Sequence, residues 1–251
     1  MGRCHTAVLN WHGTLIGEPT EAKLWEQAGM YLLGKSIPFR PVRLVKLIGS
    51  ASTLYDLTKE HKEGRMDYSS FKELMYQHFN PEVLHGTKRK HLDSILERYA
   101  EDAVSRLDRG IINVLGEFKA NPAHSCEILS TGCKDAISAV LSSSGYGHVF
   151  DRIVANRFDY QRNGTVDRFN YNGVSKAASM RQKLDESKNK SGYLYMGDGL
   201  EDDEEIFGML MDAGGGIAIS PRARDDVKLS AQHKFGAFVG SPKELRRYLV
   251  G

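Results

Sequence analysis

The chain has 251 residues, of which 41% are hydrophobic and 26% charged, which is ordinary for a globular protein with one substantial core, alone or with a smaller appended domain. Its 34 basic and 32 acidic residues leave a net charge of +2, so nucleic acid is not expected as a partner. No run of about 18 apolar residues is present, so we expect no membrane-spanning helix. We also expect no signal peptide and a cytoplasmic location.

The three cysteines, Cys4, Cys126 and Cys133, form no C-x-x-C pair. An odd number of cysteines without metal-type spacing favours small core residues over a redox or metal site. This pattern agrees with a reducing compartment.

The first predicted element is a short buried strand over residues 7–9, which leads into a glycine-containing turn. From residue 20 to residue 118 the apolar side chains recur at helical spacing. The helices predicted in this region cover residues 22–33, 42–57, 68–79 and 92–118.

After residue 124 the pattern changes to alternating strands and helices. The strands are predicted over residues 126–130, 150–155, 192–196 and 216–220, and the helices over residues 134–142, 176–187, 204–213 and 242–250. A hairpin is predicted over residues 158–171, because Asn163-Gly164 favours a tight turn with positive φ.

This alternation predicts an α/β fold, a three-layer Rossmann-like parallel sheet with helices on both faces. The helical region lies between the first strand and the rest of the sheet. We therefore expect a core domain formed by residues 1–18 and 119–251, and a mainly helical cap domain formed by residues 19–118.

Four polar segments follow predicted strands or begin a predicted helix. In chain order they are Asn10-Trp11-His12-Gly13-Thr14-Leu15, Ser130-Thr131-Gly132, Lys176, and Gly197-Asp198-Gly199-Leu200-Glu201-Asp202. Together they resemble the motifs of the haloacid dehalogenase (HAD) superfamily, and the layout of the chain is most similar to its phosphoserine-phosphatase-like subgroup. The carboxyl ends of parallel strands, where these segments fall, are the usual ligand-binding edge of such a sheet.

The resemblance implies a phosphate-binding site. The hydroxyl group of Ser130 and the N–H groups of Thr131 and Gly132 would hold a phosphate oxygen, and Lys176 would balance the negative charge. Each of these features is common when taken singly, so the hypothesis depends on their order and spacing.

The resemblance also implies a magnesium ion, since Mg²⁺ prefers hard oxygen ligands. Asp198 would be a metal ligand, and Asp202 would order the loop around it. The side chain at position 10 and the backbone carbonyl of His12 are the other ligand positions. Because Asn10 is neutral, we expect Mg²⁺ to bind weakly if it binds.

The first motif departs from the family pattern, Asp-x-Asp-Gly-Thr-Leu. Asn10 stands where the family has its nucleophile, and an amide is a poor nucleophile. His12 stands at the position of the acid/base aspartate. Its imidazole is able to carry a proton near neutral pH, or to help hold an anion.

Three explanations of this departure are open. The first is a natural protein that binds a small phosphorylated ligand or a protein partner with weak or no hydrolysis. The second is an active, magnesium-dependent phosphatase of a small phosphorylated metabolite, with chemistry based on His12 or an activated water. The third is a phosphatase altered to trap its ligand. A trap normally changes one aspartate, so two changed positions favour the first explanation.

Charged residues near the first motif and in the predicted cap are candidates for contacts to a phosphoserine-like substrate. They are Glu18, Glu21, Arg40, Arg43 and Arg65. None matches the family residue by residue, and we interpret them as surface charges.

Overall fold

The computed structural model describes residues 4–17, 24, 26–31, 49, 52–53, 55–57, 59–61, 63–66, 70–71, 74, 84–171, 173–199 and 202–251, with Asp202 described by its backbone alone. In the ranges 22–33, 42–57 and 68–79, where helices are predicted, the described residues are helical. The remaining residues of these ranges lie outside the described part of the chain.

In the described part of the chain, seven strands form one sheet. They are β1 (Thr6–Leu9), β2 (Ser125–Cys133), β3 (Arg152–Tyr160), β4 (Val166–Asn170), β5 (Tyr193–Gly197), β6 (Gly216–Ile219) and β7 (Phe238–Val239). Their order in the sheet is β4-β3-β2-β1-β5-β6-β7, and the pairs are parallel except for the antiparallel hairpin of β3 and β4. The predicted hairpin is confirmed, with Gly164 at a φ of 75° in its turn.

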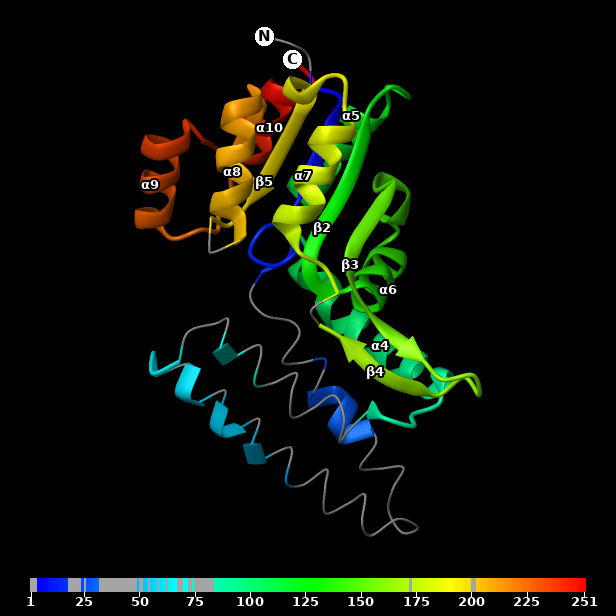
Figure 1. Cartoon of the computed structure of the whole chain (residues 1–251). Coiled ribbons are helices and arrows are strands. Elements are labelled where there is room, and N and C mark those ends of the chain that lie inside the picture. The colour runs from blue at the N-terminus through cyan, green and yellow to red at the C-terminus, as the bar shows by residue number, and fades with distance from the viewer. Residues whose placement is uncertain are drawn as a thin grey trace.

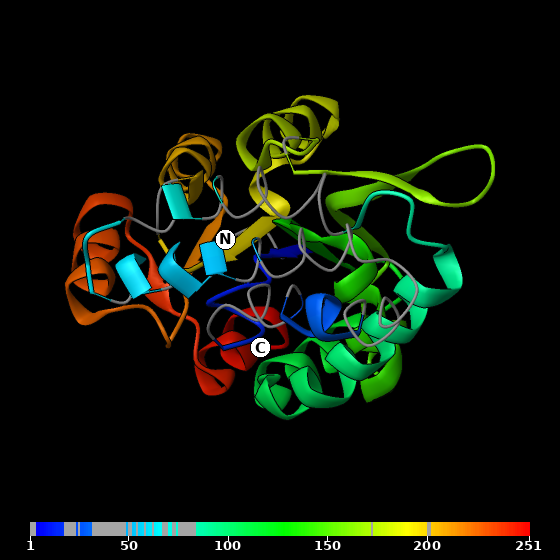
Figure 2. The same cartoon turned by 90° about the horizontal axis from the view of Figure 1, so that it is seen from below.

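Helices cover both faces of the sheet, as Figures 1 and 2 show. They are α4 (Arg89–Ala103), α5 (Arg109–Lys119), α6 (Lys134–Ser144), α7 (Lys176–Glu186), α8 (Asp202–Ala213), α9 (Asp225–Phe235) and α10 (Pro242–Leu249), with short 3-10 turns η2 (Val104–Arg106), η3 (Gly147–Val149) and η4 (Lys190–Gly192). Helices α7, α8 and α9 lie on one face, and α4, α5, α6 and α10 on the other. The predicted three-layer α/β fold is confirmed.

The central strands supply side chains to two cores because consecutive residues of a strand point to opposite faces. Ala7 and Leu9 of β1 pack with the layer of α4, α5, α6 and α10, whereas Val8 packs with α7, α8 and α9. Tyr195 of β5 also belongs to the second core, together with Phe207 of α8. Burial on both faces explains why these strands are almost wholly apolar in sequence.

Local sequence signals set several helix ends. Side chains of Asp108, Ser175 and Ser241 cap α5, α7 and α10 by accepting hydrogen bonds from backbone N–H groups of the first turn. Helices α6 and α9 end at Gly145 and Gly236, both in the left-handed conformation that glycine adopts most easily.

The single helix predicted over residues 92–118 is wrong. The chain leaves the helical conformation at Leu107, whose backbone is extended and forms a bridge with Ile16, and helix α5 starts afresh after Asp108. Apolar spacing continues across the break because α4 and α5 both bury one face, so periodicity alone does not reveal it. Helix α9 and strand β7 were not predicted, since their segments are weakly patterned.

Helices α4 and α5 fall within the range predicted as the cap, residues 19–118. Helix α4 packs against α6, and α5 packs against α10, η3 and β2. Helix α4 also contacts Tyr31, which precedes it in the chain, through the ring of His91 and the guanidinium group of Arg98. The division into a core domain and a cap domain at residues 18 and 118 therefore stays a prediction.

Candidate functional site

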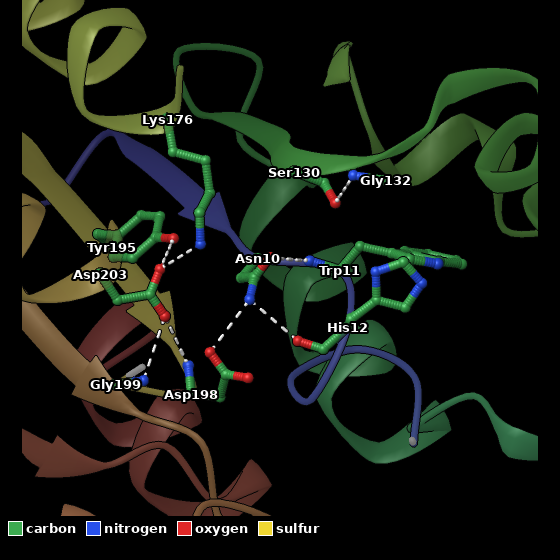
Figure 3. A network of polar contacts seen from close by, with 10 residues as sticks. All are labelled: Asn10, Trp11, His12, Ser130, Gly132, Lys176, Tyr195, Asp198, Gly199 and Asp203. Atoms are coloured by element: carbon green, nitrogen blue, oxygen red, sulfur yellow. Dashed lines mark hydrogen bonds and ion pairs between the residues drawn. The ribbon is translucent and has the colours of Figure 1, made fainter. Parts of the chain in front are cut away.

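The sheet register brings three of the predicted segments together. Leu9 at the end of β1 pairs with Ile128 of β2 on one side and with Met196 of β5 on the other. Asn10 follows Leu9 directly, and Ser130 and Asp198 each follow their paired residue by two positions. All three therefore lie at the carboxyl edge of the central strands, as Figure 3 shows.

The side chain of Asn10 is held by three hydrogen bonds. Its Oδ1 atom accepts from the backbone N–H of Trp11 at 2.9 Å. Its Nδ2 atom donates to the backbone carbonyl of His12 at 2.9 Å and to Oδ1 of Asp198 at 3.3 Å. Asn10 is only 6% exposed, so these bonds are sheltered from water.

The partners of this amide fix its orientation. The Trp11 N–H requires an acceptor, and the His12 carbonyl requires a donor, whether or not the Asp198 carboxyl carries a proton. Turning the amide by 180° would place its NH₂ group against the Trp11 N–H and its oxygen against two other oxygens. Asn10 therefore presents a neutral NH₂ group to the interior of the site.

On the other side of the site, Asp203 is the centre of a buried network. One carboxylate oxygen accepts from Lys176 Nζ and from the Tyr195 hydroxyl, both at 2.6 Å. The other accepts from the backbone N–H groups of Asp198 at 2.9 Å and Gly199 at 3.1 Å. Asp203 thus ties the loop after β5 to α8 and holds the ammonium group of Lys176 (Figure 3).

The pKa values of Asp198 and Asp203 are shifted in opposite directions. Burial raises the pKa of Asp198 to about 8, and the neighbouring charge of Asp203 adds to the rise. Burial alone would also raise the pKa of Asp203, but the Lys176 ammonium and hydrogen bonds outweigh it and hold that pKa below its ordinary value. Asp203 is therefore the fixed negative charge of the site.

The phosphate-binding segment lies in an irregular part of β2. Its register with β3 shifts between Leu129 and Cys133, and Ser130 Oγ accepts from the Gly132 N–H at 3.0 Å within this bulge. Strand β2 thus continues past Ser130, where the prediction ended it. Bulges of this kind redirect side chains and backbone groups near binding sites.

The side chain of Asn156 in β3 forms hydrogen bonds that stabilise this bulge. Its buried side chain donates to the carbonyls of Thr131 at 2.7 Å and Tyr171 at 2.6 Å, and accepts from the Val174 N–H at 2.9 Å. It therefore connects the end of β2 to the segment that leads into α7, which begins with Lys176.

His12 contributes its backbone carbonyl to the site, whereas its imidazole points away from Asp198 in Figure 3. The loop is closed by Ser220, whose hydroxyl donates to the Gly13 carbonyl at 2.7 Å. Gly13 itself has a φ of 69°, and a Cβ atom there would lie 2.4 Å from Oδ2 of Asp198. The glycine is thus required both by the turn and by the close approach of Asp198.

The structure brings together Asn10, Ser130, Thr131, Gly132, Lys176 and Asp198, together with the His12 carbonyl. The side chain of Asp202, predicted to order the loop, is outside the described atoms, so its role stays a prediction; the described contacts to that loop come from Asp203. Sequence reasoning missed the roles of Asp203, Tyr195, Asn156 and Ser220. Polar residues at strand ends were the available signal for Asn156 and Ser220.

Of the five candidates for substrate contacts, the structure describes Arg65 alone. Glu18, Glu21, Arg40 and Arg43 lie outside the described residues. Arg65 is exposed and pairs with Glu63, in agreement with a surface charge.

The residues present fit a magnesium ion poorly. The resemblance assigns Asp198, the side chain at position 10 and the His12 carbonyl to the ion, yet Asn10 directs an NH₂ group at the other two. Within the described ranges no group of three His, Cys, Asp or Glu side chains is arranged to hold a metal.

Among the described helices, none is long and apolar enough to cross a membrane.

The three cysteines are buried, and none of the three forms a disulfide bond. Burial raises the pKa of Cys4 to about 11 and that of Cys126 to about 12, so these two thiols stay protonated near neutral pH. The prediction of core residues is confirmed.

No family model matches the sequence, and no curated protein matches it either. Its fold, however, is similar to solved structures along almost the whole chain. A substrate-bound phosphoserine phosphatase is 16% identical, with a TM-score of 0.58 over 99% of this chain and 100% of the other. A protein of unknown function from Bordetella pertussis Tohama I is 13% identical, with a TM-score of 0.62 over 94% of this chain and 98% of the other.

A HAD family hydrolase from Salmonella enterica subsp. enterica serovar Typhi is 14% identical, with a TM-score of 0.55 over 95% of this chain and 68% of the other. These likenesses establish the fold, which is that of the HAD hydrolases and the phosphoserine phosphatases. The resemblance found in the four sequence segments is thereby confirmed at the level of the fold.

Proposed function

We propose that this protein binds a small phosphorylated ligand at the carboxyl edge of its sheet and hydrolyses it weakly or not at all. The observation that carries the proposal is the state of Asn10. A neutral amide, fixed by three hydrogen bonds, stands at the position of the attacking carboxylate. An amide is a poor nucleophile, so the covalent step expected of this fold lacks its attacking group.

The groups expected to hold a phosphate support the binding half of the proposal. Ser130 Oγ accepts a hydrogen bond from the bulge and keeps its own hydrogen to donate. Lys176 supplies a buried positive charge next to the same edge, and it is only 6% exposed. Donors and a cation fixed before the ligand arrives favour an anion without a large cost of reorganisation.

The relatives in fold imply magnesium as the cofactor. We expect a lowered affinity for Mg²⁺ here, because position 10 carries no negative charge and Asp198 is the one carboxylate of the described residues that faces the amide. The active phosphatase remains the competing function, and it requires an attacking group other than Asn10, such as His12 or an activated water.

Two measurements on one sample test the proposal. Phosphoserine, glycerol phosphate and an aryl phosphate are added to the folded protein, and both thermal stabilisation and phosphate release are recorded. We expect a ligand in this series to raise the melting temperature without release of phosphate, since a ligand that binds only the native state stabilises it. Multiple turnovers with any of them would favour the competing function.

The site is checked by Ser130→Ala, which removes the hydroxyl donor and should abolish the stabilisation. Ser143→Ala is the matched control, because Ser143 is exposed on α6, away from the edge of the sheet. A ligand response unchanged in Ser130→Ala would place binding elsewhere and contradict the proposal.

A further inference from the structure

We infer that the NH₂ group of Asn10 takes the place of a divalent cation, so that this site binds the phosphate of its ligand as an anion without a metal ion. The inference rests on the proposed function, because the ligand and the site are the same. It goes further in assigning how the charge of the site is balanced.

The NH₂ group of Asn10 lies between two oxygens that a cation would otherwise bind. Its Nδ2 atom donates to the His12 carbonyl and to the Asp198 carboxyl oxygen, at 2.9 and 3.3 Å. A cation bound between these two oxygens would draw both of them toward itself. The NH₂ group, with two hydrogens and a partial positive charge, satisfies the same two oxygens by hydrogen bonds instead.

Turning the Asn10 amide toward a cation would cost a buried hydrogen bond. To offer its oxygen to a cation, Asn10 would have to turn its amide over and face the Trp11 N–H with NH₂. That N–H belongs to a residue only 1% exposed, so it would lose its acceptor in a dry environment. Because a buried donor would be left without a partner, the affinity for a cation falls by about tenfold or more. An aspartate at position 10 escapes this conflict, because both of its oxygens are acceptors.

The charges of the site also balance without a divalent cation. Asp203 carries the negative charge that matches Lys176, and the two lie 2.6 Å apart. Asn10 and His12 stand in place of two carboxylates, so two negative charges are absent from the pattern that the sequence resembles. This loss equals the two positive charges of a divalent cation, so the site keeps its balance of charge without the ion.

A titration with Mn²⁺, followed by electron paramagnetic resonance of the free ion, tests the inference without any phosphorylated ligand. The samples are the wild type, Asn10→Asp, and Asn163→Asp as a matched control. Asn163 lies exposed in the β3–β4 turn and accepts from the Thr165 N–H through Oδ1, a bond that an aspartate retains. Since both replacements are of asparagine by aspartate, the two variants change the net charge by the same amount.

We expect the wild type and the control to bind Mn²⁺ equally weakly, and Asn10→Asp to bind it at least about tenfold more tightly, by the loss of the amide conflict. Tight binding by the wild type that is abolished in Asp198→Asn would overturn the inference. Equal affinities of Asn10→Asp and the wild type would also overturn it. If Asn10→Asp does not fold, the double variant with His12→Asp takes its place, and the wild-type arm still decides.

The outcome is independent of the proposed function. A protein that excludes Mn²⁺ but responds to no phosphorylated ligand would refute the proposed function and leave the exclusion of the cation standing. A protein that binds its ligand only when Mn²⁺ is present would refute the inference and leave the proposed function intact.

Discussion

The replacement Asp203→Asn should be among the most destabilising single changes in the protein. The carboxylate serves Lys176 and the Tyr195 hydroxyl with one oxygen, and the N–H groups of Asp198 and Gly199 with the other. An amide of the same shape has one acceptor oxygen and can serve only one of these two pairs. The ammonium of Lys176 also loses its counter-charge, while the pair is 6% and 0% exposed.

Removing one partner of a buried ion pair costs about 3–5 kcal/mol, because the other charge is left uncompensated. For a chain of this size, each kcal/mol lowers the melting temperature by about 2–4 °C. We therefore expect a fall of about 6–20 °C in a calorimetric or circular-dichroism melt. The double variant Lys176→Met with Asp203→Asn should recover part of the loss, because it removes the orphaned charge.

The control for this measurement is an ion pair at the surface. Glu205 accepts from Arg181 at 2.8 Å, but the side chains are 56% and 63% exposed, so Glu205→Gln should cost less than about 1 kcal/mol. If Asp203→Asn melts within a degree or two of Glu205→Gln, the reasoning about the buried network is refuted.

Three further predictions concern the same edge of the sheet. Asn156→Ala should lower the free energy of unfolding by about 3 kcal/mol in urea titrations, because it leaves buried backbone partners unpaired; a loss under about 0.5 kcal/mol would contradict its role. Gly197→Ala should lower the free energy of unfolding by about 2 kcal/mol, since the new Cβ would lie 2.2 Å from Asp203 Oδ2. The control Gly208→Ala has open space around its Cβ and should be neutral or stabilising. Equal effects of the two replacements would contradict the close packing around Gly197. The pair Asn10→Asp with His12→Asp should raise magnesium-dependent release of phosphate from an aryl phosphate above the wild-type level; continued inactivity would show that the site has changed beyond its first loop.

Much of the fold follows from the sequence because strand and helix patterns alternate after residue 124, apart from the hairpin of β3 and β4. The polar segments were expected at the carboxyl ends of parallel strands, and the parallel register of β1 with β2 and β5 brings three of them to one edge. The break between α4 and α5 was not predictable from periodicity, since both helices bury apolar faces. Asp108, a helix-capping residue, was the local signal for it.

Within the site, sequence patterns identify residue types but not the direction in which a side chain points. Asp202 and Asp203 are adjacent carboxylates, and only the start of α8 determines that Asp203 faces Lys176. The orientation of the Asn10 amide depends in the same way on three partners, one of which is 188 residues away in sequence. Such contacts are set by the tertiary structure.

The measurement that most directly tests binding without hydrolysis is a phosphorus-31 NMR spectrum of phosphoserine mixed with the protein over several hours. We expect the phosphoserine resonance to broaden or shift as protein is added, while inorganic phosphate stays below the concentration of the protein. An inorganic phosphate signal that exceeds the protein concentration would contradict binding without hydrolysis, and so would resonances of phosphoserine and the other phosphorylated ligands that the protein leaves unchanged.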